Sequence, residues 1–258
     1  MAKLKLRRIS AVQQSQGTDA SFNTAHDIVH NPLVDRETAG TKIRHKKMPR
    51  LTPKQQGLLN QSLMDAVHSQ RWDKAILFLK LGADVDSHMG TNTALMVTAW
   101  FGQAKIVKLF IKKGANVNIQ DGNGKTALMY AAGNFEFAQE RTKVVKVLID
   151  NGANVDIQDK EGKTALMHAT MNVHTETVKY LLSIGADPFL ENNYGETAHD
   201  LTRIYDLTGI EEIREFLMAF GNIWERTGKE QTVVLVQDIN AAIKECSPAR
   251  MKETFGGL

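Results

Sequence analysis

Apolar residues recur at helical spacing along most of the chain, in pairs of short segments separated by turn residues. The first segment follows Thr52 and Pro53, a pair suited to the cap and first position of a helix. Its apolar residues are three or four apart, which places them on one helix face: Leu59, Leu63, Ala66 and Val67. A second segment begins near Trp72 and ends at Gly82, a residue suited to the left-handed conformation just past a helix end. The pattern predicts a helical hairpin over residues 53–82.

The start of the first helix in each pair recurs in nearly the same letters. It reads T-A-L-M-V-T-A from Thr93, G-K-T-A-L-M-Y-A-A from Gly124, G-K-T-A-L-M-H-A from Gly162, and a weaker G-E-T-A-H-D-L from Gly195. The four threonines, Thr93, Thr126, Thr164 and Thr197, are spaced by 33, 38 and 33 residues. A period in this range indicates an array of stacked repeats. Each second helix ends at a Gly-Ala pair, and a turn-rich segment leads to the next threonine.

These letters resemble the ankyrin repeat, whose first helix reads G-x-T-P-L-H-x-A-A and whose second helix ends in G-A-D-V-N. The resemblance covers about two thirds of the 258 residues. Alanine replaces the family proline, and methionine replaces the family histidine, at Met96, Met129 and Met167. Alanine is a good helix former and methionine favours an apolar contact, so we expect the helices to persist. The T-A-L-M wording looks bacterial.

The resemblance implies an all-α ankyrin-repeat solenoid, built of paired antiparallel helices with projecting hairpin turns. We expect a basic, mostly disordered and flexible arm over residues 1–52, an array over 53–220, and a capping helix and tail over 221–258. The array would hold about five units including caps, at residues 54–86, 87–118, 119–156, 157–189 and 190–220. For the tail, an amphipathic helix over 231–246 is expected, and a partner-binding or secretion segment is the alternative.

Composition indicates the compartment of the protein and the partners that its charge would suit. The apolar fraction of 42% and the charged fraction of 24% are ordinary, and no apolar run approaches the roughly 20 residues of a membrane span. The single cysteine, Cys246, rules out an intramolecular disulfide and two-cysteine metal motifs, so we expect a cytoplasmic protein. Residues 1–50 hold ten Lys/Arg against four Asp/Glu, and this basic arm could contact nucleic acid or another acidic surface.

The sequence offers no convincing catalytic constellation. The eight histidines form no metal-ligand cluster, since His168 and His174 are six residues apart rather than the three or four that share a helix face. Gly122, Gly124, Lys125 and Thr126 superficially resemble a phosphate loop, but the G-x-x-x-x-G-K-[ST] spacing is absent. We therefore expect a protein that is not an enzyme and has no catalytic residue, cofactor or metal.

In the resembled family, partners bind across the concave face formed by the turns and first helices. This implies a monomeric adaptor for a protein or peptide, and an effector delivered into a host cell is one setting. Nucleic-acid binding through the arm is the alternative function. Positions that differ between repeats are the expected partner-binding residues, namely Met89, Trp100, Phe101, Asn123, Asn134, Phe135, Phe137, Glu161, Met171, Asn172, Tyr194 and Tyr205.

Two of these expectations have alternatives. Trp100 and Phe101 would either bind the partner or pack between units, because aromatic residues serve both purposes. The excess of five residues in the 38-residue spacing falls between Ala132 and Val144. It would lengthen the link between helices or add a helical turn, with Phe135 and Phe137 either exposed as a contact site or buried.

Overall fold

The computed structural model describes residues 51–133, 138–205, 207 and 209–234. The chain divides into two units, residues 1–58 and residues 59–258. Of the first unit only residues 51–58 are described, and they include the start of α2 (Pro53–His68). Thr52 Oγ1 accepts a hydrogen bond from Gln55 N at 3.3 Å, and Gln55 Oε1 accepts one from Thr52 N at 2.9 Å. These reciprocal bonds cap α2 at the position that the sequence predicts. The expected arm, with its two basic clusters, lies outside the described residues.

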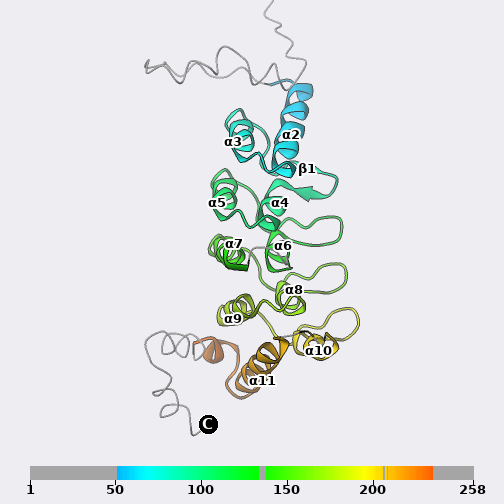
Figure 1. The fold of residues 1–258 in the computed structure, drawn as a ribbon, viewed down its shortest axis with the longest axis vertical. Helices are drawn as coiled ribbons and strands as arrows, with labels where there is room; N and C mark the ends of the chain where they lie inside the picture. The colour runs from blue at the N-terminus through cyan, green and yellow to red at the C-terminus, as the bar shows by residue number, and fades with distance from the viewer. Residues whose placement is uncertain (1–50, 134–137, 206, 208, 235–258) are drawn as a thin grey trace, which may run out of the picture. The chain divides into compact units, whose positions relative to one another are not determined.

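The second unit is a stack of helix pairs. After the last part of α2 come α3 (Trp72–Lys80), β1 (His88–Met89), β2 (Asn92–Thr93), α4 (Ala94–Trp100), α5 (Ala104–Lys112), α6 (Ala127–Gly133), α7 (Ala138–Asp150), α8 (Ala165–Met171), α9 (Thr175–Ser183), α10 (Ala198–Ile204) and α11 (Ile210–Thr227). In Figure 1, α4, α6, α8 and α10 follow one another in one column, α3, α5, α7 and α9 in a second, and the hairpin turns project from the first. The predicted helical solenoid is confirmed.

A threonine caps each first helix. The hydroxyls of Thr93, Thr126, Thr164 and Thr197 each accept a hydrogen bond, at 3.3 Å, from the backbone N–H three residues later. The bond satisfies one of the donors that a helix start leaves free, which explains why threonine recurs at this position. In the first copy, Met96 Sδ also accepts a hydrogen bond from Thr93 N at 3.4 Å.

The core lies between successive pairs and is repeated from pair to pair. The first helices bury alanine, leucine and methionine, and Met96, Met129 and Met167 are at most 2% exposed. The second helices add apolar residues on one face, including the fully buried Phe110, Leu148 and Leu181. The apolar environment expected for the methionines is thus observed. Each pair is covered by its neighbours, as a stacked repeat requires.

The hairpin turns are joined to one another by backbone hydrogen bonds. Lys160 N donates to Asn123 O at 2.9 Å, and Asn193 N donates to Glu161 O at 2.9 Å. The side chain of Gln158 reinforces the joint, because its Nε2 donates to Gly162 O within the turn and to Glu191 O in the next turn. Adjacent turns therefore keep a fixed register. The first turn differs, since β1 and β2 pair as a short antiparallel ladder.

The extra residues in the long repeat lengthen its second helix. α7 has 13 residues, whereas α3, α5 and α9 have 9 each. The difference is about one turn of α-helix, so part of the insertion is helical. Residues 134–137, which contain Asn134, Phe135 and Phe137, lie outside the described residues, and the exposure of these aromatic side chains stays a prediction.

The last helix extends beyond the end predicted for the array. α11 continues through residue 220 to Thr227, so the proposed boundary falls inside a helix. The reason is that the apolar face continues: Phe220 is buried and packs against Trp224, with ring centroids 5.6 Å apart. A further helical segment begins at residue 229, earlier than the 231 that the sequence predicts, and is described as far as residue 234.

Two glycines offer a test of the packing between turns. Gly124 and Gly152 both have left-handed backbones, with φ of 79° and 86°. A Cβ at Gly152 would meet nothing within 4 Å, whereas at Gly124 it would lie 2.8 Å from Lys160 N. We expect Gly152→Ala to lower the free energy of unfolding by about 1–2 kcal/mol from backbone strain alone. Gly124→Ala should lower it by about 1–3 kcal/mol more, because backbone must move.

Urea denaturation followed by circular dichroism measures both variants. Equal losses for Gly124→Ala and Gly152→Ala would contradict the close approach of neighbouring turns.

Candidate protein-binding face

The four hairpin turns and the first helices that follow them form one surface, here called the hairpin face. It consists of the turns before α4, α6, α8 and α10 together with the exposed parts of those helices. The second helices, α5, α7 and α9, lie in the other column (Figure 1). Residues that differ between repeats are presented here on backbone whose position is set by the repeated residues.

An aspartate organises each of the two central turns. Asp121 Oδ1 accepts hydrogen bonds from Asn123 N and Lys125 N, both at 2.8 Å. Asp159 Oδ1 accepts the equivalent bonds from Glu161 N and Lys163 N, both at 2.9 Å. Both carboxylates are buried, and a buried carboxylate needs such donors. The aspartates therefore fix the shape of the turns.

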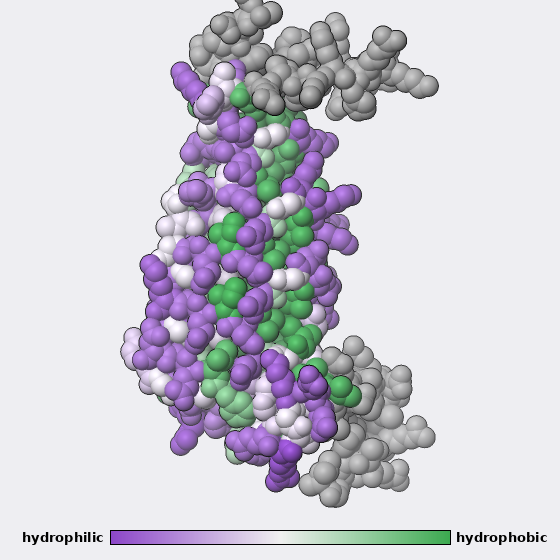
Figure 2. Space-filling model, turned by 180° about the vertical axis from the view of Figure 1, so that it is seen from behind, coloured by the Kyte–Doolittle hydropathy of each residue, from purple (hydrophilic) through white to green (hydrophobic). Residues whose placement is uncertain are grey.

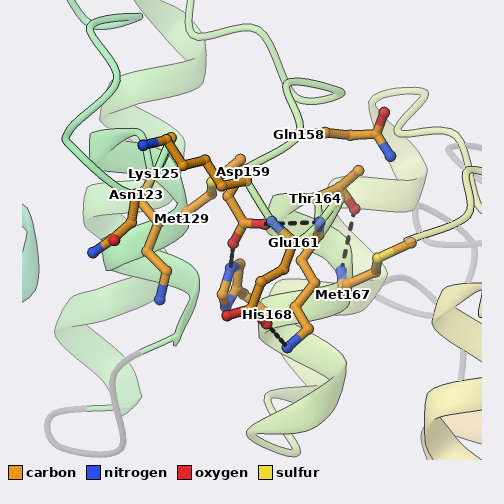
Figure 3. Close-up of polar contacts among 12 residues, drawn as sticks. Asn123, Lys125, Met129, Gln158, Asp159, Glu161, Thr164, Met167 and His168 are labelled. Atoms are coloured by element: carbon orange, nitrogen blue, oxygen red, sulfur yellow. Dashed lines mark hydrogen bonds and ion pairs between the residues drawn. The ribbon is translucent and has the colours of Figure 1, made fainter. Parts of the chain in front are cut away.

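The second oxygen of each aspartate reaches the following helix. Tyr130 Oη donates to Asp121 Oδ2 at 2.6 Å, and His168 Nε2 lies 2.8 Å from Asp159 Oδ2. Figure 3 shows His168 on its helix pointing at Asp159 in the turn. Tyr130 and His168 occupy the same position in their repeats, four residues after the capping threonine. Each of these two turns is thus joined to the helix that follows it by an aspartate and a ring, Asp121 with Tyr130 or Asp159 with His168, and each such pair is here called a clamp.

Burial and the hydrogen bonds of the clamps change the pKa values of Asp159 and Tyr130. Burial by itself raises the pKa of Asp159, but the hydrogen bonds from His168 and from Lys163 N outweigh it, so the pKa lies below its ordinary value. Burial, and then the bond to Asp121, raise the pKa of Tyr130. At neutral pH the Asp159 carboxylate is therefore ionised and the Tyr130 phenol is protonated, the states in which their hydrogen bonds form.

Charged groups lie at the edge of the clamp in the third turn. Lys163 Nζ forms an ion pair with Glu161 Oε2 at 2.6 Å, and Glu161 is exposed. Burial lowers the pKa of Lys163, but Glu161, and to a lesser degree Tyr205 and Asp159, raise it on balance. Tyr205 therefore lies close enough to act on the Lys163 charge. Glu161 and Tyr205, both predicted site residues, thus act on the charge of the same lysine.

The two predicted aromatic neighbours have different environments. Trp100 is 42% exposed and meets Tyr130 edge-on, with ring centroids 6.0 Å apart. Phe101 is half-buried and packs edge-on against Trp72 of α3 at 6.1 Å. Trp100 thus presents an aromatic surface on the hairpin face, whereas Phe101 packs between successive pairs.

The other predicted residues spread over the same face. Asn123 and Tyr194 are exposed in their turns, and Tyr194 is the most exposed of the large apolar side chains at 74%. Met89, Met171 and Asn172 are half-buried. Asn172 Nδ2 donates to His168 O at 2.7 Å, which fixes its position at the end of α8.

Figure 2 views the molecule from the side opposite to Figure 1. Hydrophobic residues there appear as separate groups that recur along the array, with hydrophilic residues around them. Repetition of this kind follows from a stack in which equivalent positions are exposed at regular intervals.

Sequence reasoning missed the clamp residues, although a signal for them exists. Asp121 stands five residues before Thr126 and Tyr130 four after it, and Asp159, Thr164 and His168 repeat this spacing. The spacing alone could have paired the aspartate with the aromatic ring.

A second missed cluster joins the long repeat to the next one. Arg141 of α7 is 2% exposed, and its Nη1 contacts His174 Nε2. His174 Nδ1 lies 2.6 Å from Ala132 O, so the neutral imidazole donates to the carbonyl and accepts from the guanidinium. Burial, assisted by the Arg141 charge, lowers the pKa of His174 to about 4.

Comparison with known proteins identifies the repeats. A family model described as ankyrin repeats in three copies matches residues 63–159 and 137–221, more than half of the 258 residues. The chain belongs to the ankyrin-repeat family. This ankyrin-repeat protein is 27% identical over 130 residues to the "Transient receptor potential cation channel subfamily A member 1 homolog" of Caenorhabditis elegans. That stretch is 49% of the chain and 10% of the relative, so the chain spans about a tenth of the relative's length.

Ankyrin repeats are typically protein-interaction modules and are not catalytic. Among the described residues of this ankyrin-repeat protein, no three His, Cys, Asp or Glu side chains gather in a way that could hold a metal ion. Within the same ranges, no helix has the length and apolar character needed to cross a membrane. The bacterial character of the repeat wording stays a prediction.

The buried His174 predicts a pH-dependent stability. Its folded pKa, about 4, is below the ordinary 6.5, so the unfolded chain binds the proton more tightly. The stabilisation is fully present above pH 6.5 and declines as the pH falls toward 4. We expect this residue alone to contribute a loss of about 2–3 kcal/mol in the free energy of unfolding over that range.

Urea denaturation at pH 7.5 and pH 4.5 tests this for the wild type, for His174→Gln and for His88→Gln, an exposed control. His174→Gln should lose less stability between the two pH values than the other two proteins. The same pH dependence in all three would show that His174 does not titrate as stated.

Proposed function

We propose that this ankyrin-repeat protein is a non-enzymatic adaptor that binds an extended segment of a partner protein along the hairpin face. The partly exposed indole of Trp100 carries the proposal. It rests edge-on against Tyr130, which is itself bonded to Asp121, so the ring is held in place before any partner arrives. A preorganised aromatic side chain loses little entropy on binding, and tryptophan is among the residues that dominate binding energies at interfaces.

Polar groups in the neighbouring repeats supply specificity. The exposed Asn123 and Tyr194 lie in turns that are joined by hydrogen bonds through Lys160 and Glu161. Glu161 and Lys163 present both signs of charge close to Tyr205. Charges at the rim of an interface mainly select the partner and speed association, while aromatic anchors supply affinity. The chemistry suits a segment with an apolar side chain near Trp100 and polar groups toward the third and fourth turns.

Replacement of Trp100 tests this function. Trp100→Ala should reduce partner recovery in a pull-down followed by mass spectrometry by about tenfold or more, because an aromatic anchor contributes about 2 kcal/mol or more. It should lower the free energy of unfolding by only about 1–2 kcal/mol, since the ring is 42% exposed.

Lys112→Ala, on the exposed surface of α5, is the control and should leave recovery unchanged. Unchanged recovery with Trp100→Ala would argue against the hairpin face. Loss of the circular dichroism signal in this variant would instead assign Trp100 to the core.

The basic arm supports a second candidate function. Its surplus of six positive charges, ten Lys/Arg against four Asp/Glu in residues 1–50, suits nucleic acid or another acidic surface. Such binding weakens steeply with salt because counterions are released. A chain lacking residues 1–50 should then lose salt-dependent binding to duplex DNA or RNA. Equal binding by the full and shortened chains would remove this candidate.

A further inference from the structure

A pocket of about 530 Å³ lies between α10 and α11, at the C-terminal end of the array. His199 and Arg203 of α10 and Arg214 and Met218 of α11 line it. Its volume falls in the range of about 300–1,000 Å³ that is usual for small-molecule sites. Among the described residues, the lining contains two arginines and a histidine but no acidic residue, which suits an anionic ligand.

Arg214 is held in place by buried groups. Its Nη2 donates to Thr202 O at 2.6 Å, and its Nε lies 3.3 Å from Thr202 Oγ1. Thr202 is fully buried on α10, so it anchors the guanidinium to the neighbouring helix. These two bonds use two of the five N–H donors of arginine. A guanidinium fixed in this way loses little freedom when a ligand binds.

The positive charge of the pocket is not neutralised by an ion pair in the described part of the chain. The ion pairs found there use lysines and His168, and none includes Arg203 or Arg214. Asp200 of α10 is a neighbouring carboxylate that accepts hydrogen bonds from Thr197 N at 3.0 Å and Thr197 Oγ1 at 2.7 Å. These bonds, and to a lesser degree the charges of His199 and Arg203, lower its pKa, so Asp200 offsets part of the pocket's charge without forming an ion pair. Glu211 and Glu215 flank Arg214 along α11 without lining the pocket.

Two further features suit an oxygen-bearing ligand with an apolar body. His199 Nε2 is buried and has no hydrogen-bond partner among the described residues. A buried polar atom without a partner is unfavourable, so a ligand oxygen that reached this nitrogen through a shift of the ring would stabilise it. Met218 is 53% exposed and provides a flexible apolar wall.

We propose that this end pocket binds an oxyanion, a carboxylate or a phosphate group, carried on a small apolar or aromatic body. Arg203 and Arg214 hold the anionic group with paired N–H donors, the geometry in which guanidinium groups recognise such oxyanions. Met218 contacts the body of the ligand. The proposal does not rest on the proposed function, because Trp100, the proposed anchor of the partner, lies on α4, whereas this pocket lies between α10 and α11 (Figure 1).

Titration with simple probes tests the proposal on the full chain. The probes are phenyl phosphate and benzoate, with uncharged benzamide as the matched control. The readout is the ¹³C-methyl NMR signal of Met218, assigned by its disappearance in Met218→Leu, while the buried Met96, Met129 and Met167 serve as internal references. Phenyl phosphate, benzoate or both should shift the Met218 signal saturably, and benzamide should not. The probe that saturates the shift at the lower concentration identifies the favoured group as phosphate or carboxylate.

Variants separate a specific site from a general attraction to positive charge. Arg203→Gln changes an exposed residue and should weaken the anionic probes about tenfold or more, because a charge-assisted hydrogen bond is lost. Arg226→Gln removes an exposed arginine of α11 that does not line the pocket and should bind like the wild type. No saturable shift, an equal shift with benzamide, or an equal loss in both variants overturns the proposal.

A carboxylate of the chain itself could compete for the pocket. Asp206, which lies outside the described residues, is close in sequence to Arg203, so Asp206→Asn is titrated in parallel. If the anionic probes bind only to Asp206→Asn, the chain supplies the anion and the proposal is overturned. Binding of similar strength in Asp206→Asn and in the wild type supports it.

Discussion

Each helix pair in this protein can bury its apolar face only against the pair before it and the pair after it. A seven-residue helix such as α4 or α6 is too short to be stable by itself in water. Its alanine, leucine and methionine side chains become buried only because the next first helix lies against them. The need for stacked neighbours explains why the motif repeats and why the repeated residues are small, apolar or capping.

The hairpin turns add a polar joint to this apolar stack. Backbone bonds join neighbouring turns, as from Lys160 to Asn123, and the buried Asp121 and Asp159 tie each central turn to the helix after it. Buried carboxylates are unfavourable unless fully bonded, so each aspartate permits only one shape of its turn. The turns consequently hold their variable side chains in place, and the stability of the stack and the presentation of a binding face have the same cause.

The closing end of the stack has different chemistry from the repeats before it. In those repeats, Trp100 of α4 and Tyr130 of α6 present an aromatic surface on the hairpin face. At the C-terminal side, α11 has no following first helix in the described chain. It packs against α10 and α9, buries Ile210, Ile213 and Leu217, and leaves Arg214 and Met218 around a pocket. The exposed side of α11 does not have to pack against a following repeat in the described chain. Its residues can therefore form a binding pocket as well as cover the core.

The sequence by itself determined the repeat, the helix starts and stops, and the family. These features depend on local chemistry. A threonine hydroxyl caps the helix that follows it, and glycines such as Gly82 and Gly152 adopt the left-handed backbone just past a helix end. The continuation of α11 past residue 220 was missed, because Phe220 and Trp224 are informative only once they are seen to pack together.

Only the tertiary structure decided which side chains meet across repeats. Trp100 and Phe101 are adjacent in sequence, yet one contacts Tyr130 in the next repeat and the other contacts Trp72 in the previous one. Arg141 and His174 lie 33 residues apart and become partners only through the lengthened α7. Spacing along the chain predicts contacts within a repeat, but contacts between repeats depend on the rotation and register of the stack, which no short stretch of sequence contains.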